Sequence, residues 1–289
     1  MITIIAIILR ILANPFANVF QKRLTGSGHN ALTVNFMSYL LLSVACLTIS
    51  PGTDWPALSV GFWLYALLGG IFGSVGNAFL VLALHRGDLS ILGPVNSYKS
   101  IVGMVTGIVL LGELPSLMGF AGVVVIVFGS YFIFETMKEG FSWRLLKNCE
   151  IQFRLTAMVL TAIEAVFIKK VILFSDTSTA FVVWCWFGAL FAFLLQIVMR
   201  VNLRREVLIT HKRDSLAFVA MTACIGITQY ATTYTFSHID VGYGLALFQL
   251  STIVSVVMGC RLFHEQNIKK KLLGSVIMVA GAVMVIFSS

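Results

Sequence analysis

Three ionisable side chains lie in the middle of long apolar segments, where their chemistry suits the binding of a small charged solute. Arg10, Lys99 and Glu164 are all far from the ends of these segments. A charged side chain at the centre of a bilayer costs about 2.5–3.5 kcal/mol on insertion scales, so such residues are rare and point to a functional site. The two cations suit a carboxylate or a phosphate, whereas Glu164 suits an amine or accepts a proton.

Two structural explanations compete with this interpretation. Arg10 could extend its long side chain towards the interface, or it could pair with another helix. Lys99 and Glu164 could form an ion pair that only holds two helices together. The sequence leaves these alternatives open. Whether Lys99 and Glu164 touch one another decides between an ion pair and a solute-binding role for these two residues.

Amides accompany these charges at helical spacing. Arg10, Asn14 and Asn18 follow one another at intervals of four residues, so they share one face of a helix. Polar residues inside hydrocarbon are expected to face the protein interior or water, which predicts a polar cavity between the helices. The other candidate solute-binding residues are Asn77, Asn96, Gln229, Tyr230, Tyr234 and Gln249. Tyrosine is the less specific signal, because it also anchors helices at membrane interfaces.

The segments that carry these residues are long enough to cross a membrane. Of 289 residues, 58% are hydrophobic and 11% charged, whereas soluble domains have about 45–50% and about 25%. Since a helix needs about 20 apolar residues to cross the hydrocarbon layer, the sequence predicts an all-α integral membrane protein with ten transmembrane helices. The predicted spans are 2–23, 31–50, 60–84, 89–112, 116–135, 153–174, 178–199, 215–236, 241–263 and 268–287.

The two halves of the chain repeat one another. A shift of 152 residues superimposes identical residues at Asp88 and Asp240, Glu113 and Glu265, Gly122 and Gly274, and Gly129 and Gly281. The same shift places Asn77 on Gln229 and Lys99 on Ser251, which are not identical. A weaker similarity, at a shift of 147 residues, relates 17–23 to 164–170. The predicted units are a first five-helix repeat at 1–136, a connecting loop at 137–152 and a second repeat at 153–289.

An odd number of spans in each repeat implies that the second repeat enters the membrane upside down relative to the first. The sequence therefore predicts two inverted five-helix repeats, an architecture that suits alternating access around a site near the midplane. The fifth and tenth spans contain neither an amide nor a charge in their interiors, so they are predicted to lie outside the cavity.

One short motif in each repeat resembles the EamA family of the drug/metabolite transporter (DMT) superfamily. The motif reads Leu-Leu-Gly-Glu at 110–113 and Leu-Phe-His-Glu at 262–265, and a glycine-rich helix follows each copy. The resemblance covers nearly the whole chain, although His264 replaces the glycine of the first copy. It implies a multi-pass carrier of the bacterial inner membrane, with a central cavity lined by helices one to four and six to nine.

Charge outside the spans predicts orientation. The net charge is +8, but Lys and Arg lie in short connectors rather than on one aromatic-rich face, so no nucleic-acid partner is expected. Most of them fall in the odd-numbered connectors, which the positive-inside rule places in the cytoplasm, with both termini outside. The family resemblance implies the opposite orientation for the termini.

The favoured function is therefore a secondary transporter that moves an amino acid or another small zwitterionic or anionic metabolite by alternating access. The sequence is compatible with transport coupled to protons and with a homodimer, and it decides neither. The alternatives are a flippase for lipids or other amphiphiles, an exporter of cationic drugs and, less favoured, a non-transporting membrane partner subunit. No nucleophile motif or metal-ligand cluster suggests an enzyme, a metal site or a cofactor.

Overall fold

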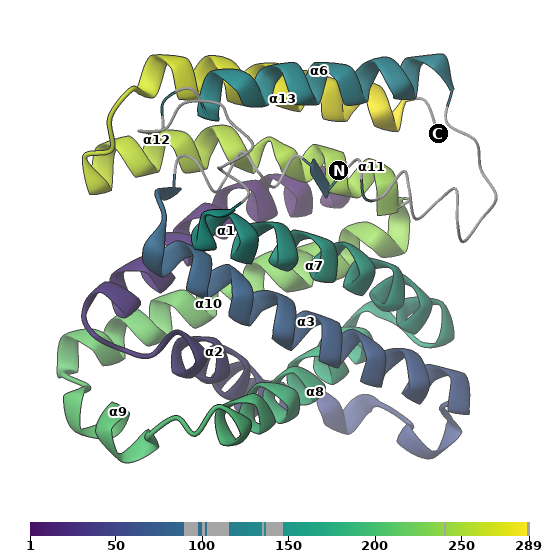
Figure 1. Ribbon diagram of the computed structural model, residues 1–289. Helices are drawn as coiled ribbons and strands as arrows, with labels where there is room; N and C mark the ends of the chain where they lie inside the picture. Colours follow the sequence, from purple (N-terminus) through teal and green to yellow (C-terminus); the bar gives the residue numbers. More distant parts are fainter. Residues whose placement is uncertain are drawn as a thin grey trace.

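The computed structural model describes residues 1–89, 98–99, 102, 116–134, 136, 147–239 and 241–287. These residues form helices and connectors, with no strand among them (Figure 1). The helices are α1 (Ile2–Gly26), α2 (Ala31–Cys46), α3 (Val60–Arg86), α6 (Leu117–Phe134), α7 (Cys149–Phe174), α8 (Thr177–Val198), α9 (Leu203–Ile209), α10 (Lys212–His238), α11 (Val241–Gln249), α12 (Ser251–Phe263) and α13 (Ile268–Ile286), with short 3-10 turns at Ser50–Gly52 and Trp55–Ala57.

The lengths and hydropathies of these helices are those of a membrane protein. Four helices, α1, α3, α8 and α10, are long and apolar enough to cross a bilayer, and α2 is apolar but shorter. Most of the predicted fourth span, 89–112, lies outside the described residues. The all-helical membrane class is therefore supported, whereas the number of ten spans remains a prediction.

The predicted boundaries need correction at several places. The ninth span, predicted as one helix, is two helices that meet at Leu250, where the backbone N–H of Leu250 bonds to the carbonyl of Leu247, 3.2 Å away. The second span ends four residues early, before the segment that contains Pro51. The sixth begins at Cys149 instead of at residue 153, and the connector 200–214 contains the additional helix α9.

The packing of the helices follows the repeat. Helix α3 of the first repeat packs along α7 of the second, and α10 of the second packs along α1 of the first. Helices α2 and α8 pack together, as do α6 and α13. Figure 1 shows the last pair lying side by side at the top of the molecule, beyond the other helices. Exchange of the two repeats turns the first two contacts into one another and leaves the last two unchanged, as expected for a two-fold relation between the halves.

Glycines allow the closest of these contacts. A Cβ atom added at Gly274 would lie 2.7 Å from the carbonyl oxygen of Gly129, and one at Gly281 would lie 2.7 Å from that of Gly122. The repeat makes Gly122 equivalent to Gly274 and Gly129 equivalent to Gly281, so the two contacts are equivalent to one another. Without side chains at these points, the backbones of α6 and α13 can approach closely.

Two lysines occupy corresponding positions at the helix ends of the two repeats. Lys22 donates to the carbonyl of Gly87 (2.9 Å), and Lys169 donates to that of Ile239 (3.4 Å). Lys22 also forms a salt bridge of 3.1 Å with Glu265, whose carboxylate accepts the backbone N–H of Leu89 at 2.8 Å. Glu265 thus ties the connector after α12 to both α1 and the residues after α3.

A side-chain cap fixes the start of α8 outside its membrane-spanning part. The carboxylate of Asp176 accepts the backbone N–H groups of Ser178 (2.7 Å) and Thr179 (3.2 Å) and the hydroxyl of Thr179 (2.5 Å). Partial burial tends to raise the pKa of Asp176, but these hydrogen bonds to the ionised form outweigh it and hold the pKa below its usual value.

The contact between α6 and α13 predicts the effect of a single methyl group. We expect Gly274→Ala to destabilise the protein by about 1–3 kcal/mol, because the new Cβ would overlap the backbone of α6. Thermal unfolding of the purified protein in detergent measures this effect. Gly26→Ala is the control, since nothing lies within 4 Å of a Cβ at that helical position. Equal unfolding temperatures for the two variants would show that the close contact is absent.

Candidate functional site

A central cavity of 130 Å³ lies between the helices of both repeats. Its lining comes from α1, α2, α3, α7, α8, α10 and α11, together with Lys99. No described residue of α6 or α13 takes part, which agrees with the prediction that the fifth and tenth spans lie outside the cavity. The lining is strongly polar for a site between apolar helices, so it is the part of the described molecule where a solute can be held.

The structure gathers most of the candidate residues around this cavity, but not all of them. Those that line it are Arg10, Asn14, Asn77, Lys99, Glu164 and Gln229. Tyr230, Tyr234 and Gln249 do not line it, and Asn96 lies outside the described residues. Tyr230 is 41% exposed. Tyr234 stacks on His238, and the amide of Gln249 is buried and donates to the carbonyl of Leu245.

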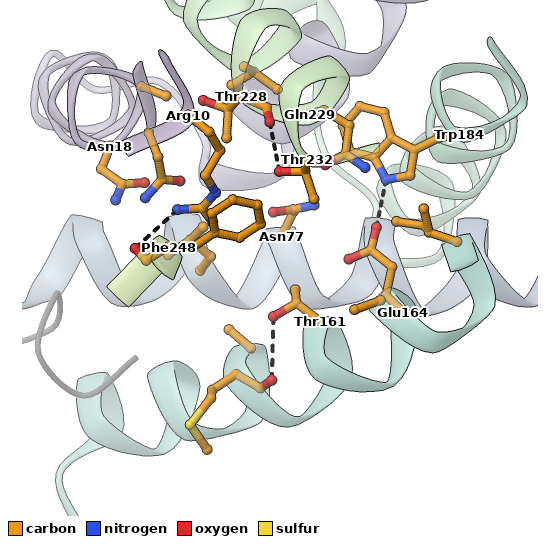
Figure 2. Close-up of a pocket in the computed structure, with 18 of the residues that line it drawn as sticks. Arg10, Asn18, Asn77, Thr161, Glu164, Trp184, Thr228, Gln229, Thr232 and Phe248 are labelled. Atoms are coloured by element: carbon orange, nitrogen blue, oxygen red, sulfur yellow. Dashed lines mark hydrogen bonds between the residues drawn. The ribbon is translucent and has the colours of Figure 1, made fainter. Parts of the chain in front are cut away.

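Arg10 reaches across to the break between α11 and α12. Its guanidinium group lies 4.2 Å from the centre of the Phe248 ring and makes a long hydrogen bond of 3.5 Å to the carbonyl of Phe248 (Figure 2). A second long bond, of 3.4 Å, joins it to the hydroxyl of Ser251. The side chain is only 8% exposed. Arg10 therefore pairs with another helix and does not extend to the interface.

Glu164 belongs to a network of hydrogen bonds and aromatic contacts, which lies on the right in Figure 2, away from Arg10. The indole N–H of Trp184 donates to its carboxylate at 2.6 Å. The ring of Trp184 packs against that of Tyr39, with 4.7 Å between their centroids, and the amide of Asn77 donates to the Tyr39 hydroxyl at 2.6 Å. Four helices thus contribute to one connected set of side chains.

Two glycines provide the space for this network. A Cβ atom at Gly73 would overlap the carboxylate of Glu164, and one at Gly188 would overlap the ring of Tyr39. The sequence shows these positions only as glycines in apolar helices. The structure shows that each of them lies directly beneath a polar side chain of the cavity.

Lys99 differs from the cavity residues Arg10 and Glu164 because it makes no hydrogen bond and no ion pair within the described part of the chain. Its side chain is partly exposed and lines the cavity together with Glu164. The salt bridges of the described residues do not include one between Lys99 and Glu164. The purely structural ion pair that the sequence allowed is therefore not formed, and Lys99 faces the cavity.

Arg154 is a charged residue of the cavity that is not among the candidates from the sequence, as is also the case for the uncharged Tyr39 and Trp184. The sixth span was predicted to begin at residue 153, which puts Arg154 at its very start, beside the connector. Since α7 begins at Cys149, Arg154 lies in its second turn, is only 6% exposed and lines the cavity. Helical spacing could have found it, because Arg154 precedes the cavity residue Thr161 by seven residues, which is about two turns.

Comparison with known proteins places the chain in a family. The model of the EamA-like transporter family matches residues 1–135 and 150–287. The chain belongs to this family. EamA proteins are transporters of the DMT type, so the polar cavity between the repeats is the expected place for their cargo. No curated protein sequence matches the chain.

A solved structure supports the fold of this EamA protein. That structure, titled "Crystal structure of protein", is 16% identical in sequence, and the match covers 95% of each chain with a TM-score of 0.66. At this level of identity the likeness shows the fold alone.

The space at Gly73 predicts how the network responds to one methyl group. We expect Gly73→Ala to displace the Glu164 carboxylate and to break its bond to Trp184, at a cost of about 1–3 kcal/mol for the buried group left without a partner. The measurement is the emission spectrum of Trp184 in a background where the other tryptophans are phenylalanine, together with the unfolding temperature. The matched control is Gly69→Ala on the same helix, where the added Cβ meets only Phe167 at 3.7 Å. If both variants gave the same spectrum as the parent, Glu164 would not occupy this position.

Proposed function

We propose that this EamA protein is a secondary carrier that moves a small anionic or zwitterionic metabolite across the membrane by alternating access. The observation that carries the proposal is Lys99, a cation without a partner among the described residues, on the wall of a central polar cavity. A buried or half-buried ammonium group is costly unless it is paired. A solute with a carboxylate or phosphate group supplies the missing partner.

The size of the cavity supports a small cargo. An engineered protein cavity of about 150 Å³ holds a benzene molecule. The cavity in this structure measures 130 Å³, so in this conformation it suits a solute with a similar or smaller number of heavy atoms. Amides at its wall, including Asn14 and Gln229, offer hydrogen bonds that can orient such a solute.

The two-fold packing supports the mechanism. Two equivalent halves can exchange inward-open and outward-open shapes around a central site. The interruption of the ninth span at Leu250 lies next to the residues that bind Arg10, and interrupted helices at the midplane are a recurring feature of carriers.

The rival functions receive less support. An exporter of organic cations would have to bring positive charge towards Arg10, Lys99 and Arg154. A flippase would need a path for acyl chains, whereas charges and amides line this cavity. A non-transporting subunit is most easily explained by a paired Lys99 and Glu164, and no such pair is formed.

Transport by purified protein in proteoliposomes tests the proposal. The screen covers amino acids, other carboxylates, phosphorylated metabolites and cationic drugs. For the solute that is carried, we expect Lys99→Met to lower uptake by about tenfold or more, because a hydrogen bond to a charged group contributes about 1.5–3 kcal/mol. Lys170→Met is the matched control, since Lys170 is exposed and does not line the cavity. Intact transport in both Lys99→Met and Glu164→Gln would place the site elsewhere.

A further inference from the structure

We propose that His29, Glu206 and Asp214 form a gate that keeps the central cavity closed on the face of the molecule where α9 lies. None of these three residues lines the cavity, so they have no part in holding the solute. A gate presupposes the proposed carrier function, because a carrier has to open its site to each side of the membrane in turn. The contacts of His29, the apolar layer beneath it and the distribution of ion pairs in the molecule support this role.

The imidazole of His29 is held between two carboxylates of the other repeat. Its Nδ1 atom lies 3.2 Å from Oε2 of Glu206 on α9, and its Nε2 atom lies 3.7 Å from Oδ2 of Asp214 in the first turn of α10. The backbone N–H of Asn30 also donates to both oxygens of Glu206, at 3.2 Å. His29 is 4% exposed and Glu206 is 7% exposed. Since His29 belongs to the connector between α1 and α2, these contacts fasten the first repeat to the second.

An apolar layer separates these three residues from the cavity. The ring of Phe218 packs edge-on against His29, with 5.3 Å between the centroids. Phe218 belongs to a buried cluster that both repeats supply, and its members are Leu24, Ala31, Val34, Val81, Phe218 and Met221. Along the chain, Gln21 lies at the cavity wall, Leu24 lies in the layer and His29 lies beyond it. The layer therefore seals the cavity at this end, and the contacts of His29 lie outside the seal.

The same order of residues recurs along α10. Asp214 is in its first turn, Phe218 lies in the apolar layer and Thr228 lines the cavity. Asp214 and Thr228 are separated by about 21 Å at a rise of 1.5 Å per residue. A solute that enters between α2 and α10 from this end has to part His29 from Asp214 and then cross the layer. Separation of these contacts is therefore a step in opening the cavity on this face.

Ion pairs between the repeats gather at this end of the molecule. In addition to the contacts of His29, the described residues form salt bridges between Lys22 and Glu265 (3.1 Å) and between Lys271 and Asp88 (3.9 Å). Each salt bridge joins the first repeat to the second. Each also lies at the end where α1 finishes and α10 begins, which is the side of α9 in Figure 1. The two halves are thus held together on this face by charged groups.

Uncharged groups join the repeats at the opposite end. There the hydroxyls of Thr53 and Thr179 lie 3.2 Å apart, and the rings of Trp55 and Trp186 pack with 5.1 Å between their centroids. Within the described ranges, no salt bridge lies at this end. The repeat relates the connector after α2, which carries Thr53, to the connector after α8, which carries Glu206. Because hydrogen bonds to charged groups are the stronger ones, we expect the α9 face to be the more firmly closed.

The accessibility of one cavity position from each side of the membrane tests the gate without a known solute. Thr228→Cys is introduced at the cavity wall of the full-length protein, after its five native cysteines have been replaced by alanine. A membrane-impermeant maleimide is applied to one face of sealed vesicles at a time, and the two labelling rates are measured. In a parallel sample, Arg205→Cys on the exposed surface of α9 identifies which face is that of α9.

We expect Glu206→Ala to raise the ratio of labelling from the α9 face to labelling from the opposite face by about tenfold. The contacts of Glu206 stabilise only the state that is closed on the α9 face, so their loss shifts the population towards the state that is open there. General loosening of the fold would speed labelling from both faces and would leave the ratio unchanged. The ratio therefore separates a gate from a merely structural contact.

The matched control is Glu150→Ala, which should leave the ratio unchanged. Glu150 lies in the first turn of α7 at the same end of the molecule, and within the described part of the chain it forms no hydrogen bond or ion pair through its side chain. An unchanged ratio in Glu206→Ala would overturn the gate. If that variant does not fold, His29→Gln answers the question in the same way, because it keeps a polar side chain but removes the imidazole between the two carboxylates.

Failure of the gate and failure of the carrier function give different results. Uptake of a solute in proteoliposomes together with an unchanged labelling ratio would overturn the gate alone. A shifted ratio without uptake of any solute in the screen would count against the carrier function, but it would support the closing contact on the α9 face.

Discussion

The requirement that polar groups find partners inside hydrocarbon governs this structure, because water is not available there to replace a missing bond. Several hydroxyl side chains among the described residues meet the requirement within their own helix. The hydroxyls of Thr228, Thr232 and Thr235 on α10 each donate to the carbonyl four residues earlier, at 2.7 Å. Charged side chains cannot be satisfied in this way, so Arg10 and Glu164 reach neighbouring helices and thereby define where the cavity lies.

The same requirement links the cavity to the interrupted ninth span. Leu250 lies between two helices that contain no proline, and the nearest glycine, Gly244, is six residues away. The guanidinium group of Arg10 contacts the residues on both sides of this point, Phe248 and Ser251. The carbonyl of Phe248 beside this interruption accepts from the buried cation, so the contact gives both polar groups a partner. The charge of α1 and the interruption of the ninth span therefore lie in contact with one another.

Helical spacing predicted the cavity better than residue type did. Arg10, Asn14 and Asn18 line it because their four-residue intervals fix them on one face, and that face needs a polar environment. Tyr230 and Tyr234 were chosen by type, but a tyrosine is stable both in the interior and at the outer surface, so type could not select the face. The interruption at Leu250 contacts Arg10, which is far away in the sequence, so local sequence did not show it. The place of Arg154 depends on a helix boundary that hydropathy locates only within a few residues.

The repeats agree where they hold the fold together and differ where a solute would bind. Gly129 and Gly281 are identical and make equivalent backbone contacts, as expected if both halves must pack in the same way in two conformations. Lys99 and Ser251 are equivalent but differ in charge, and at the shift of 147 residues Glu164 corresponds to Ala17, which also lines the cavity. A symmetric pair of halves needs no such differences for its own stability. They make sense if the cavity must distinguish one part of a bound molecule from another, since the conformational exchange can be symmetric while the cargo is not.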